Sequence, residues 1–201
     1  MTKIKICGLC RERDIAFVNQ YLPDYAGFVI NSPKNFRSLS PEKAAILIRL
    51  LNPGIPAVGI IADQPVEFAA ELLNSGGVNI LQLNGSEDNA YINSLKQQCS
   101  GEIWKYVSIS SLNDAANAAQ SAADLLVIHI PVSDSGLPDT SLLAALDRPY
   151  LLSGLSSGNA VKSVKLAKPY GIDLSEGVER NNIKDKGKIS SVIASVRGIK
   201  I

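Results

Sequence analysis

The sequence predicts a compact (β/α)8 TIM barrel, an α/β fold, as a single domain over residues 1–201. Eight short apolar runs alternate with segments of helical spacing, which indicates parallel strands joined by crossover helices. The runs are continuously apolar, as expected of strands that are covered on both faces. Eight units of roughly 25 residues favour a small closed barrel over an open doubly wound sheet.

The predicted strands are short and rich in β-branched residues. They are KIKIC (3–7), YAGFVI (25–30), AVGII (57–61), VNILQL (78–83), IWKYV (103–107), LLVIHI (125–130), YLLS (150–153) and GIDLS (171–175). No linker, close repeat or low-complexity stretch interrupts this order, so we expect one domain.

The segments between the strands carry helix-start and helix-stop signals. SPEKAAILIRLL (40–51) begins with serine as the N-cap and proline at the first helical position. QPVEFAAELLNSGG (64–77) ends in a glycine pair, a usual helix stop. The other helical segments are DNAYINSLKQQC (88–99), SLNDAANAAQSA (111–122), TSLLAAL (140–146), GNAVKSVKLA (158–167) and KGKISSVIASVRGI (186–199). We expect roughly eight helices, and we interpret NNIKDKGKI (181–189) as the loop into the last one.

Composition argues against several classes of partner. The net charge is +1 and the basic residues are scattered, which gives no electrostatic reason to expect nucleic acid or an anionic membrane. Aromatic residues make up only 5% of the chain, too few to suggest a stacking platform for bases. No apolar run reaches the length of a membrane span, and the first residues lack the pattern of a secretory signal. We therefore expect a cytoplasmic protein that acts on a small molecule.

The three cysteines do not predict a disulfide framework or a metal centre. Cys7, Cys10 and Cys99 are too few and too unevenly spaced for either. Cys7 and Cys10 form a C-x-x-C motif, but there is no second cysteine pair and no histidine nearby. We expect no metal.

In a TIM barrel the active site lies where the strands end at their carboxyl side. Cys7 ends the first predicted strand, and it is either a small buried apolar residue or a nucleophile or base. Arg37 lies in the loop after the second strand, either solvated or in contact with a substrate carboxylate. Asn84 and His129, the only histidine, end two further strands.

Two glycine-containing turns predict a phosphate site. They follow the last two strands, whose loops usually hold phosphate in such barrels through backbone N–H groups and a short helix N-terminus. The predicted phosphate-binding residues are Gly154, Leu155, Ser175, Glu176 and Gly177.

Several of these segments together resemble one known family. KIKICGL, GFV followed by SPKNFRSLSPE, AVGI, ILQLNGSED, IWKYV, GIDLSEGVE and IKDKGKI resemble, in order, the segments of phosphoribosylanthranilate isomerase, the small TIM barrel of tryptophan biosynthesis. The resemblance covers essentially the whole chain. It implies an Amadori rearrangement of N-(5-phosphoribosyl)anthranilate to an enol-amine, an aldose–ketose isomerisation without cofactor or metal. It assigns the role of general base to Cys7 and places Arg37 near the anthranilate.

The mouth of the barrel departs from the family pattern. The family ends its sixth strand with an aspartate that acts as the acid, and His129 occupies that position here. Asn84 replaces a histidine, and VSDSG (132–136) replaces a glycine-rich turn, in which Asp134 is a reserve acid and a candidate substrate contact. Glu176 replaces a serine beside the predicted phosphate, where a carboxylate repels the anion unless it points away or meets a cation.

Two interpretations of these departures remain open. Histidine can act as the acid, because its ordinary pKa near 6.5 leaves imidazolium present at neutral pH. Alternatively, the chain is a paralogue that binds or isomerises another phosphorylated metabolite. A purely structural protein is a third alternative, but no exposed apolar stripe or charged tail supports it. The sequence does not decide between a monomer and a homodimer.

Overall fold

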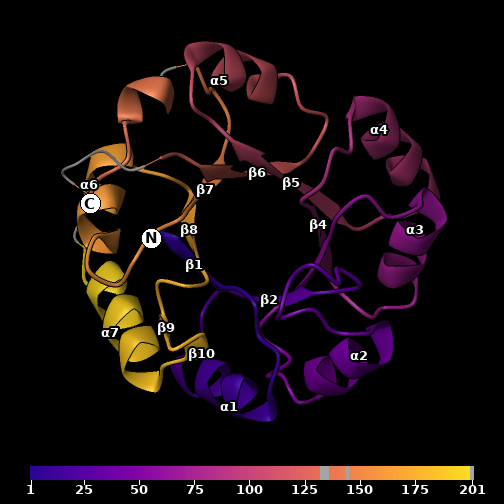
Figure 1. Cartoon of the computed structure of the whole chain (residues 1–201), viewed down its shortest axis with the longest axis horizontal. Coiled ribbons are helices and arrows are strands. Elements are labelled where there is room, and N and C mark those ends of the chain that lie inside the picture. Colours follow the sequence, from indigo (N-terminus) through magenta and orange to yellow (C-terminus); the bar gives the residue numbers. More distant parts are fainter. Residues whose placement is uncertain (132–135, 144, 200–201) are drawn as a thin grey trace.

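The computed structural model describes residues 1–131, 136–143 and 145–199. Within them, eight parallel strands follow one another in chain order around a closed barrel, and the last pairs with the first (Figure 1). The strands are β1 (Lys3–Ile6), β2 (Tyr25–Val29), β3 (Ala57–Ile61), β4 (Ile80–Leu83), β5 (Glu102–Ser108), β6 (Leu125–His129), β7 (Tyr150–Ser153) and β8 (Gly171–Leu174). The predicted (β/α)8 fold and all eight predicted strands are confirmed.

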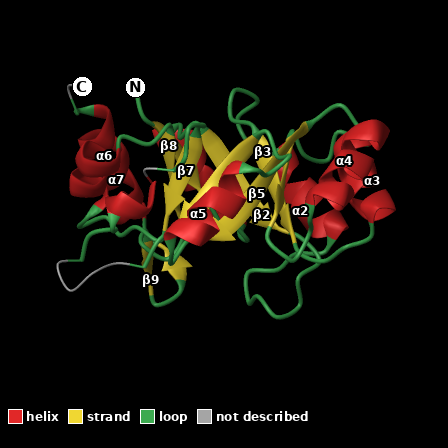
Figure 2. Ribbon diagram, turned by 90° about the horizontal axis from the view of Figure 1, so that it is seen from above, coloured by secondary structure: helices red, strands yellow, loops and turns green. Residues whose placement is uncertain are grey.

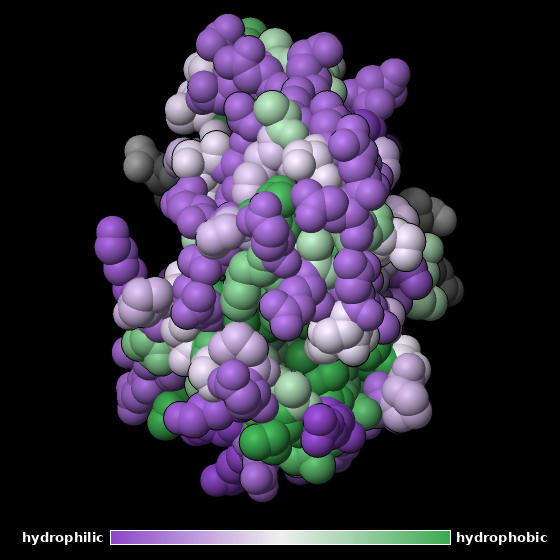
Figure 3. Space-filling model, turned by 90° about the vertical axis from the view of Figure 1, so that its right-hand side faces the viewer, coloured by the Kyte–Doolittle hydropathy of each residue, from purple (hydrophilic) through white to green (hydrophobic). Residues whose placement is uncertain are grey.

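The helices form a ring around the barrel, as Figures 1 and 2 show. They are α1 (Glu12–Tyr21), α2 (Pro41–Arg49), α3 (Val66–Asn74), α4 (Asn89–Gln98), α5 (Leu112–Ala119), α6 (Ala160–Ala167) and α7 (Lys186–Arg197). The helical segments predicted from the sequence do not include α1. Its first residues contain neither an N-cap serine nor a proline, so the usual helix-start signal is missing. On the face that carries α3 and α4, the surface is mostly hydrophilic with apolar groups showing between (Figure 3).

Short polar side chains begin several of these helices. Ser40, Asp88, Ser111 and Asp185 each accept a hydrogen bond from the backbone N–H three residues further on. The predicted stop after α3 is also confirmed, because Gly76 follows the helix with a φ of 70°.

One predicted helix is wrong in type. Of the segment TSLLAAL (140–146), only the first four residues are helical, as the 3-10 helix η1 (Thr140–Leu143), and residue 144 lies outside the described residues. The carboxylate of Asp139 accepts hydrogen bonds from the N–H and hydroxyl of Ser141. This local turn competes with regular α-helical hydrogen bonding at the start of the segment.

The predicted loop 181–189 also needs correction. β9 (Glu179–Arg180) and β10 (Ile183–Lys184) pair as an antiparallel hairpin, with Asn181 and Asn182 at φ 51° and 60° in its turn. Asparagine tolerates this left-handed backbone, which a two-residue hairpin turn requires. Figure 2 shows the hairpin on the side of the barrel opposite the N-terminus, among the loops that follow the strands.

Strand alternation separates two apolar layers and places polar groups inside the barrel. Ile4 and Ile6 pack in the larger cluster between strands and helices, whereas Lys5 on β1 and Cys7 directly after it alternate with them and face inward. A smaller apolar cluster containing Val58, Ile60 and Trp104 fills the interior. The strands are therefore not uniformly apolar, since their inner face also carries buried charged residues.

Candidate active site

A cavity of about 790 Å³ opens where the strands end at their carboxyl side. It is lined by residues from all eight strands or the loops that follow them. The predicted site residues that line it are Cys7, Arg37, Asn84, His129, Gly154, Leu155, Ser175, Glu176 and Gly177. Asp134, the remaining predicted site residue, lies outside the described residues.

Cys7 follows β1 directly and lines the cavity. Its backbone N–H donates to the carbonyl of Leu174 on β8 at 2.8 Å, and Gly8 turns the chain away with a φ of 76°. The side chain is buried but lines the cavity. Burial raises the pKa of the Cys7 thiol, and so does the negative charge of Asp173.

A glycine on the neighbouring strand makes room for this thiol. A Cβ added at Gly27 would lie 2.9 Å from Sγ of Cys7 and 3.1 Å from Cε of Lys5. Any side chain at this position of β2 would therefore displace both groups. The sulfur and the lysine occupy the space that Gly27 leaves free.

Lys5 forms the centre of a buried polar network that the sequence analysis missed. It is completely buried, and its Nζ lies 2.6 Å from Oε1 of Gln82, 3.1 Å from Oδ2 of Asp173 and 3.5 Å from Sγ of Cys7. Gln82 in turn donates to Oδ1 of Asn84 at 2.8 Å. The network thus links predicted site residues on β1 and after β4.

Asp173 has one oxygen committed to this network and one without a partner. Its Oδ1 is buried and accepts no hydrogen bond within the described part of the chain, and the side chain lines the cavity. Buried carboxylate oxygens are normally hydrogen-bonded. Oδ1 is therefore available to a donor on a bound molecule.

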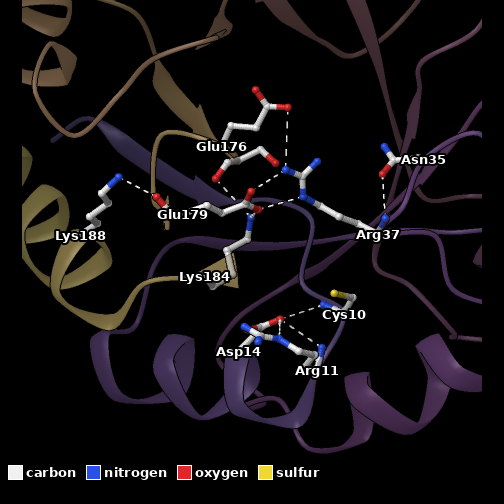
Figure 4. Close-up of polar contacts among 10 residues, drawn as sticks. Cys10, Arg11, Asp14, Asn35, Arg37, Glu176, Glu179, Lys184 and Lys188 are labelled. Carbon is white, nitrogen blue, oxygen red and sulfur yellow. Dashed lines mark hydrogen bonds and ion pairs between the residues drawn. The ribbon is translucent and has the colours of Figure 1, made fainter. Parts of the chain in front are cut away.

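Arg37 is buried rather than solvated. Its Nε donates to Oε1 of Glu179 at 2.8 Å and its Nη2 to Oε2 at 2.6 Å (Figure 4). The guanidinium also stacks on the ring of Phe36, with 4.1 Å between Cζ and the ring centroid. Glu179 comes from β9, so the hairpin fixes the arginine that faces the cavity.

Glu179 lies between two cations. Lys184 of β10 pairs with Oε1, the oxygen that also accepts from Nε of Arg37. Burial alone would raise the pKa of Glu179, but hydrogen bonds and charges from Arg37 and Lys184 outweigh it and lower that pKa. The backbone carbonyl of Glu179 accepts from Nζ of Lys188 at 2.6 Å, which ties the hairpin to α7.

Glu176 faces a cation, which is one of the two ways in which a carboxylate can be accommodated beside the predicted phosphate site. Its side chain is 83% exposed, and its Oε1 lies 3.8 Å from Nη2 of Arg37. Glu176 is exposed and the distance is long, so this pair adds little to stability. Arg37 nevertheless gives the carboxylate a cation to face (Figure 4).

The glycine-containing loops after β7 and β8 touch each other. A Cβ on Gly177 would lie 2.0 Å from the carbonyl oxygen of Leu155, and the N–H of Ser157 donates to the carbonyl of Gly177 at 3.2 Å. Ser156 and Gly177 also form an isolated parallel bridge. The backbones of the two loops therefore form one continuous surface at the cavity edge.

His129 is the last residue of β6 and lines the cavity. It is half-buried and pairs in register with Ser108 and Ser153. A Cβ on Gly154 would lie 2.5 Å from its Nδ1, so the ring occupies space that only a glycine leaves. Gly154 has a φ of 75°, which also favours glycine.

The described residues were also compared with what a membrane span and a metal centre require. They contain no helix long and apolar enough to span a membrane. They also contain no group of three or more histidine, cysteine or carboxylate side chains placed to bind a metal ion.

A closed parallel barrel with a polar cavity at the carboxyl ends of its strands defines a TIM-barrel enzyme. Residues 4–195 match the model of the N-(5'phosphoribosyl)anthranilate (PRA) isomerase family, and the chain belongs to this family.

Curated relatives and solved structures agree with this assignment. The isomerase of Thermoanaerobacter pseudethanolicus is 34% identical over 208 residues, which cover 100% of both chains. Monomers of the dimeric isomerase of Thermotoga maritima superpose with a TM-score of 0.86 at 27% identity, covering 99% of this chain and 100% of theirs. An isomerase in complex with reduced 1-(o-carboxyphenylamino)-1-deoxyribulose 5-phosphate gives a TM-score of 0.84 at 26% identity, with the same coverage.

Proposed function

We propose that the protein catalyses the Amadori rearrangement of N-(5-phosphoribosyl)anthranilate to the 1-deoxyribulose phosphate enol-amine in tryptophan biosynthesis. The family match over residues 4–195 carries this proposal. The reaction is an intramolecular aldose–ketose isomerisation: the electron pair released at C2′ reduces C1′, so no external oxidant or reductant is needed. The enzyme would therefore work without a cofactor.

Cys7 and His129 would move the two protons. His129, as imidazolium, donates a proton to the ribose ring oxygen, and opening of the ring gives a Schiff base. The thiolate of Cys7 then removes the proton at C2′, and the electron pair moves through C1′ to the nitrogen. Both side chains line one cavity from different strands, as a substrate held between an acid and a base requires.

Arg37 and the two glycine loops would hold the ends of the substrate. Glu179 leaves Nη1 of Arg37 available to the anthranilate carboxylate. Backbone N–H groups around Gly154 and Gly177 would bind the 5′-phosphate, with Leu155, Ser175 and Glu176 in the same surface. Asn84 and Asp134 complete the proposed substrate contacts.

A paralogue with an altered reaction is the second candidate. The position of His129, where the family pattern has aspartate, favours it specifically. Such a protein would keep the barrel and its phosphate site but act on another phosphorylated metabolite.

We further propose a cytoplasmic location, as expected for an enzyme acting on a phosphorylated intermediate. The assembly would be either a monomer or a homodimer like the Thermotoga maritima relative. Sedimentation of the purified protein separates these two states.

Turnover of the family substrate tests the proposal. Freshly prepared phosphoribosylanthranilate is mixed with the protein, and the loss of its fluorescence is followed in the presence of an enzyme that consumes the product. We expect a rate proportional to protein concentration. Binding of phosphosugars without any turnover would instead favour the paralogue.

A further inference from the structure

Lys5 is a fully buried cation whose position in the site has no role in the proton transfers described above. We propose that Lys5 is a positioning residue for Cys7: its ammonium group, held by Gln82 and Asp173, contacts the sulfur and stabilises it as a thiolate. The inference rests on the proposed role of Cys7 as the base.

The backbone of β1 brings the two groups together. Residues two apart on a strand point to the same face, so Lys5 and Cys7 both enter the barrel interior. Nζ of Lys5 lies 3.5 Å from Sγ of Cys7, within hydrogen-bond distance for sulfur. Charge interactions at this distance are strong when both groups are buried, because little water screens them.

Residues on two other strands hold the ammonium group in place. Gln82 on β4 accepts at 2.6 Å and Asp173 on β8 accepts at 3.1 Å. Burial alone would lower the pKa of Lys5, but the charges of Asp173 and Cys7 outweigh it and raise that pKa. Lys5 therefore stays protonated and remains a donor to the sulfur.

Four charged groups act on the Cys7 thiol, and Lys5 is the one that hydrogen-bonds to it. Asp173 on β8 disfavours the thiolate, whereas Lys184 on β10 favours it. Arg37, from the loop after β2, also interacts with Cys7. Both Lys184 and Arg37 are paired with Glu179, which offsets their charge.

The proposed step balances without any further reactant. The thiolate form of Cys7, whose charge the ammonium of Lys5 stabilises against the opposing effects of burial and Asp173, takes the C2′ proton, while the C–H electron pair moves to the Schiff base. The resulting thiol loses its proton to solvent after the product leaves. Lys5 stabilises the charged form of the sulfur and exchanges no proton with the substrate.

The test measures thiol reactivity in the absence of substrate. Cys10 and Cys99 are replaced by serine, so that Cys7 is the only thiol, and the rate of alkylation by iodoacetamide is measured against pH. Lys5→Met should move the midpoint upward by about one pH unit or more, which slows alkylation about tenfold at a fixed pH below it. Asp173→Asn should move the midpoint downward, because it removes the negative charge beside the sulfur.

Lys5→Met and Asp173→Asn should shift the alkylation midpoint in opposite directions. An effect of charge predicts this, whereas a general disturbance of packing does not. The double variant Lys5→Met/Asp173→Asn should have a midpoint between those of the single variants. Lys105→Met is the matched control: it removes another buried lysine, paired with Glu87 at 2.9 Å, and should leave the profile unchanged. Thermal melts establish that each variant is folded.

Identical profiles for the parent and a folded Lys5→Met variant would overturn the inference. If Lys5→Met does not fold, Lys5→Gln takes its place, and a midpoint equal to or below that of the parent overturns the inference. Because no substrate is present, these outcomes do not depend on turnover. A protein that isomerises phosphoribosylanthranilate but shows no shifts keeps its proposed function and loses only this role for Lys5.

Discussion

Arg37 and Glu179 form a two-point ion pair, 2.8 Å from Nε to Oε1 and 2.6 Å from Nη2 to Oε2, although 142 positions separate them in the chain. Arg37 lies in the loop after β2, and Glu179 lies in the hairpin after β8. Both side chains are almost completely buried, so the pair gains from weak screening and good geometry. The ion pair therefore fixes the loop after β2 against the hairpin after β8.

Glu179→Gln should weaken substrate binding more than it slows the chemical step. The substitution leaves Arg37 and Lys184 buried without their shared carboxylate, which costs about 3–5 kcal/mol for a buried pair. We expect KM for phosphoribosylanthranilate to rise roughly tenfold, because Arg37 is no longer fixed toward the cavity. Steady-state kinetics and urea unfolding measure the two effects.

Glu87→Gln is the control for this prediction. Glu87 is also buried and pairs with Lys105, but neither residue lines the proposed active-site cavity. It should lower the free energy of unfolding and leave KM close to the parent value. A similar rise in KM for both variants would show that the effect on Glu179→Gln is general destabilisation.

Acid should remove the stabilising contribution of Glu179. Arg37 and Lys184 hold its pKa below the ordinary value of 4.5, so its contribution is fully present above that pH. It is lost as the pH falls through the lower, folded-state pKa. The difference in unfolding free energy between the parent and Glu179→Gln should therefore be largest near pH 7 and shrink below pH 4.5. A difference that stays constant with pH would contradict this.

The positions of Cys7 and His129 could be predicted because both depend on local pattern. Each ends a β-branched run, and in a TIM barrel the end of a strand is the mouth of the site. The position of Arg37 was also predictable from its loop, but its burial was not. Its partner, Glu179, comes from a short hairpin. The turn residues of this hairpin, Asn181 and Asn182, are equally typical of a loop.

The Lys5 network could not be predicted from local pattern. Lys5, Gln82 and Asp173 lie on the first, fourth and eighth strands, and only closure of the barrel brings them within hydrogen-bond distance. A weak signal was present: each is a polar residue with an apolar residue on either side. Because residues two apart on a strand point to the same face, the sequence alone places Lys5 beside Cys7. It does not indicate the partners on the other two strands.

Cys7→Ala should reduce turnover by about two orders of magnitude or more, as expected for loss of a general base. The fold should survive, since the substitution removes one sulfur atom that lines the cavity. Cys10→Ala is the control, because Cys10 does not line the cavity and should keep turnover near the parent value. Near-parent activity of Cys7→Ala would remove Cys7 from the mechanism.

Inorganic phosphate or a phosphosugar should raise the melting temperature, because binding to the folded state alone stabilises it. Gly177→Ala should abolish this shift, since the new Cβ would lie 2.0 Å from the carbonyl oxygen of Leu155 and force the two loops apart. Gly54→Ala, where the new Cβ would be 3.3 Å from Oδ1 of Asn52, should keep the shift. No shift with any phosphorylated ligand would point to Glu176 as the group that repels the anion.

His129→Ala should be nearly inactive if the imidazolium is the acid. Steady-state turnover of phosphoribosylanthranilate by the parent and by this variant measures the difference. His129→Asp should retain or improve activity on phosphoribosylanthranilate, because it restores the group that the family pattern has at the end of this strand.

The same three proteins also separate the two candidate functions. An inactive parent whose His129→Asp variant gains isomerase activity would establish the paralogue, with one residue blocking the family reaction. Full activity of His129→Ala would instead make the histidine a bystander, and Asp134→Asn would become the variant to measure.

Gly154→Ala should displace the imidazole of His129, because the new Cβ would lie 2.5 Å from Nδ1 of the ring. Under the proposed mechanism, Gly154→Ala should lower turnover of the parent more than that of His129→Asp, because the disturbance of the proposed phosphate loop is common to both and only the parent also loses the position of its imidazole.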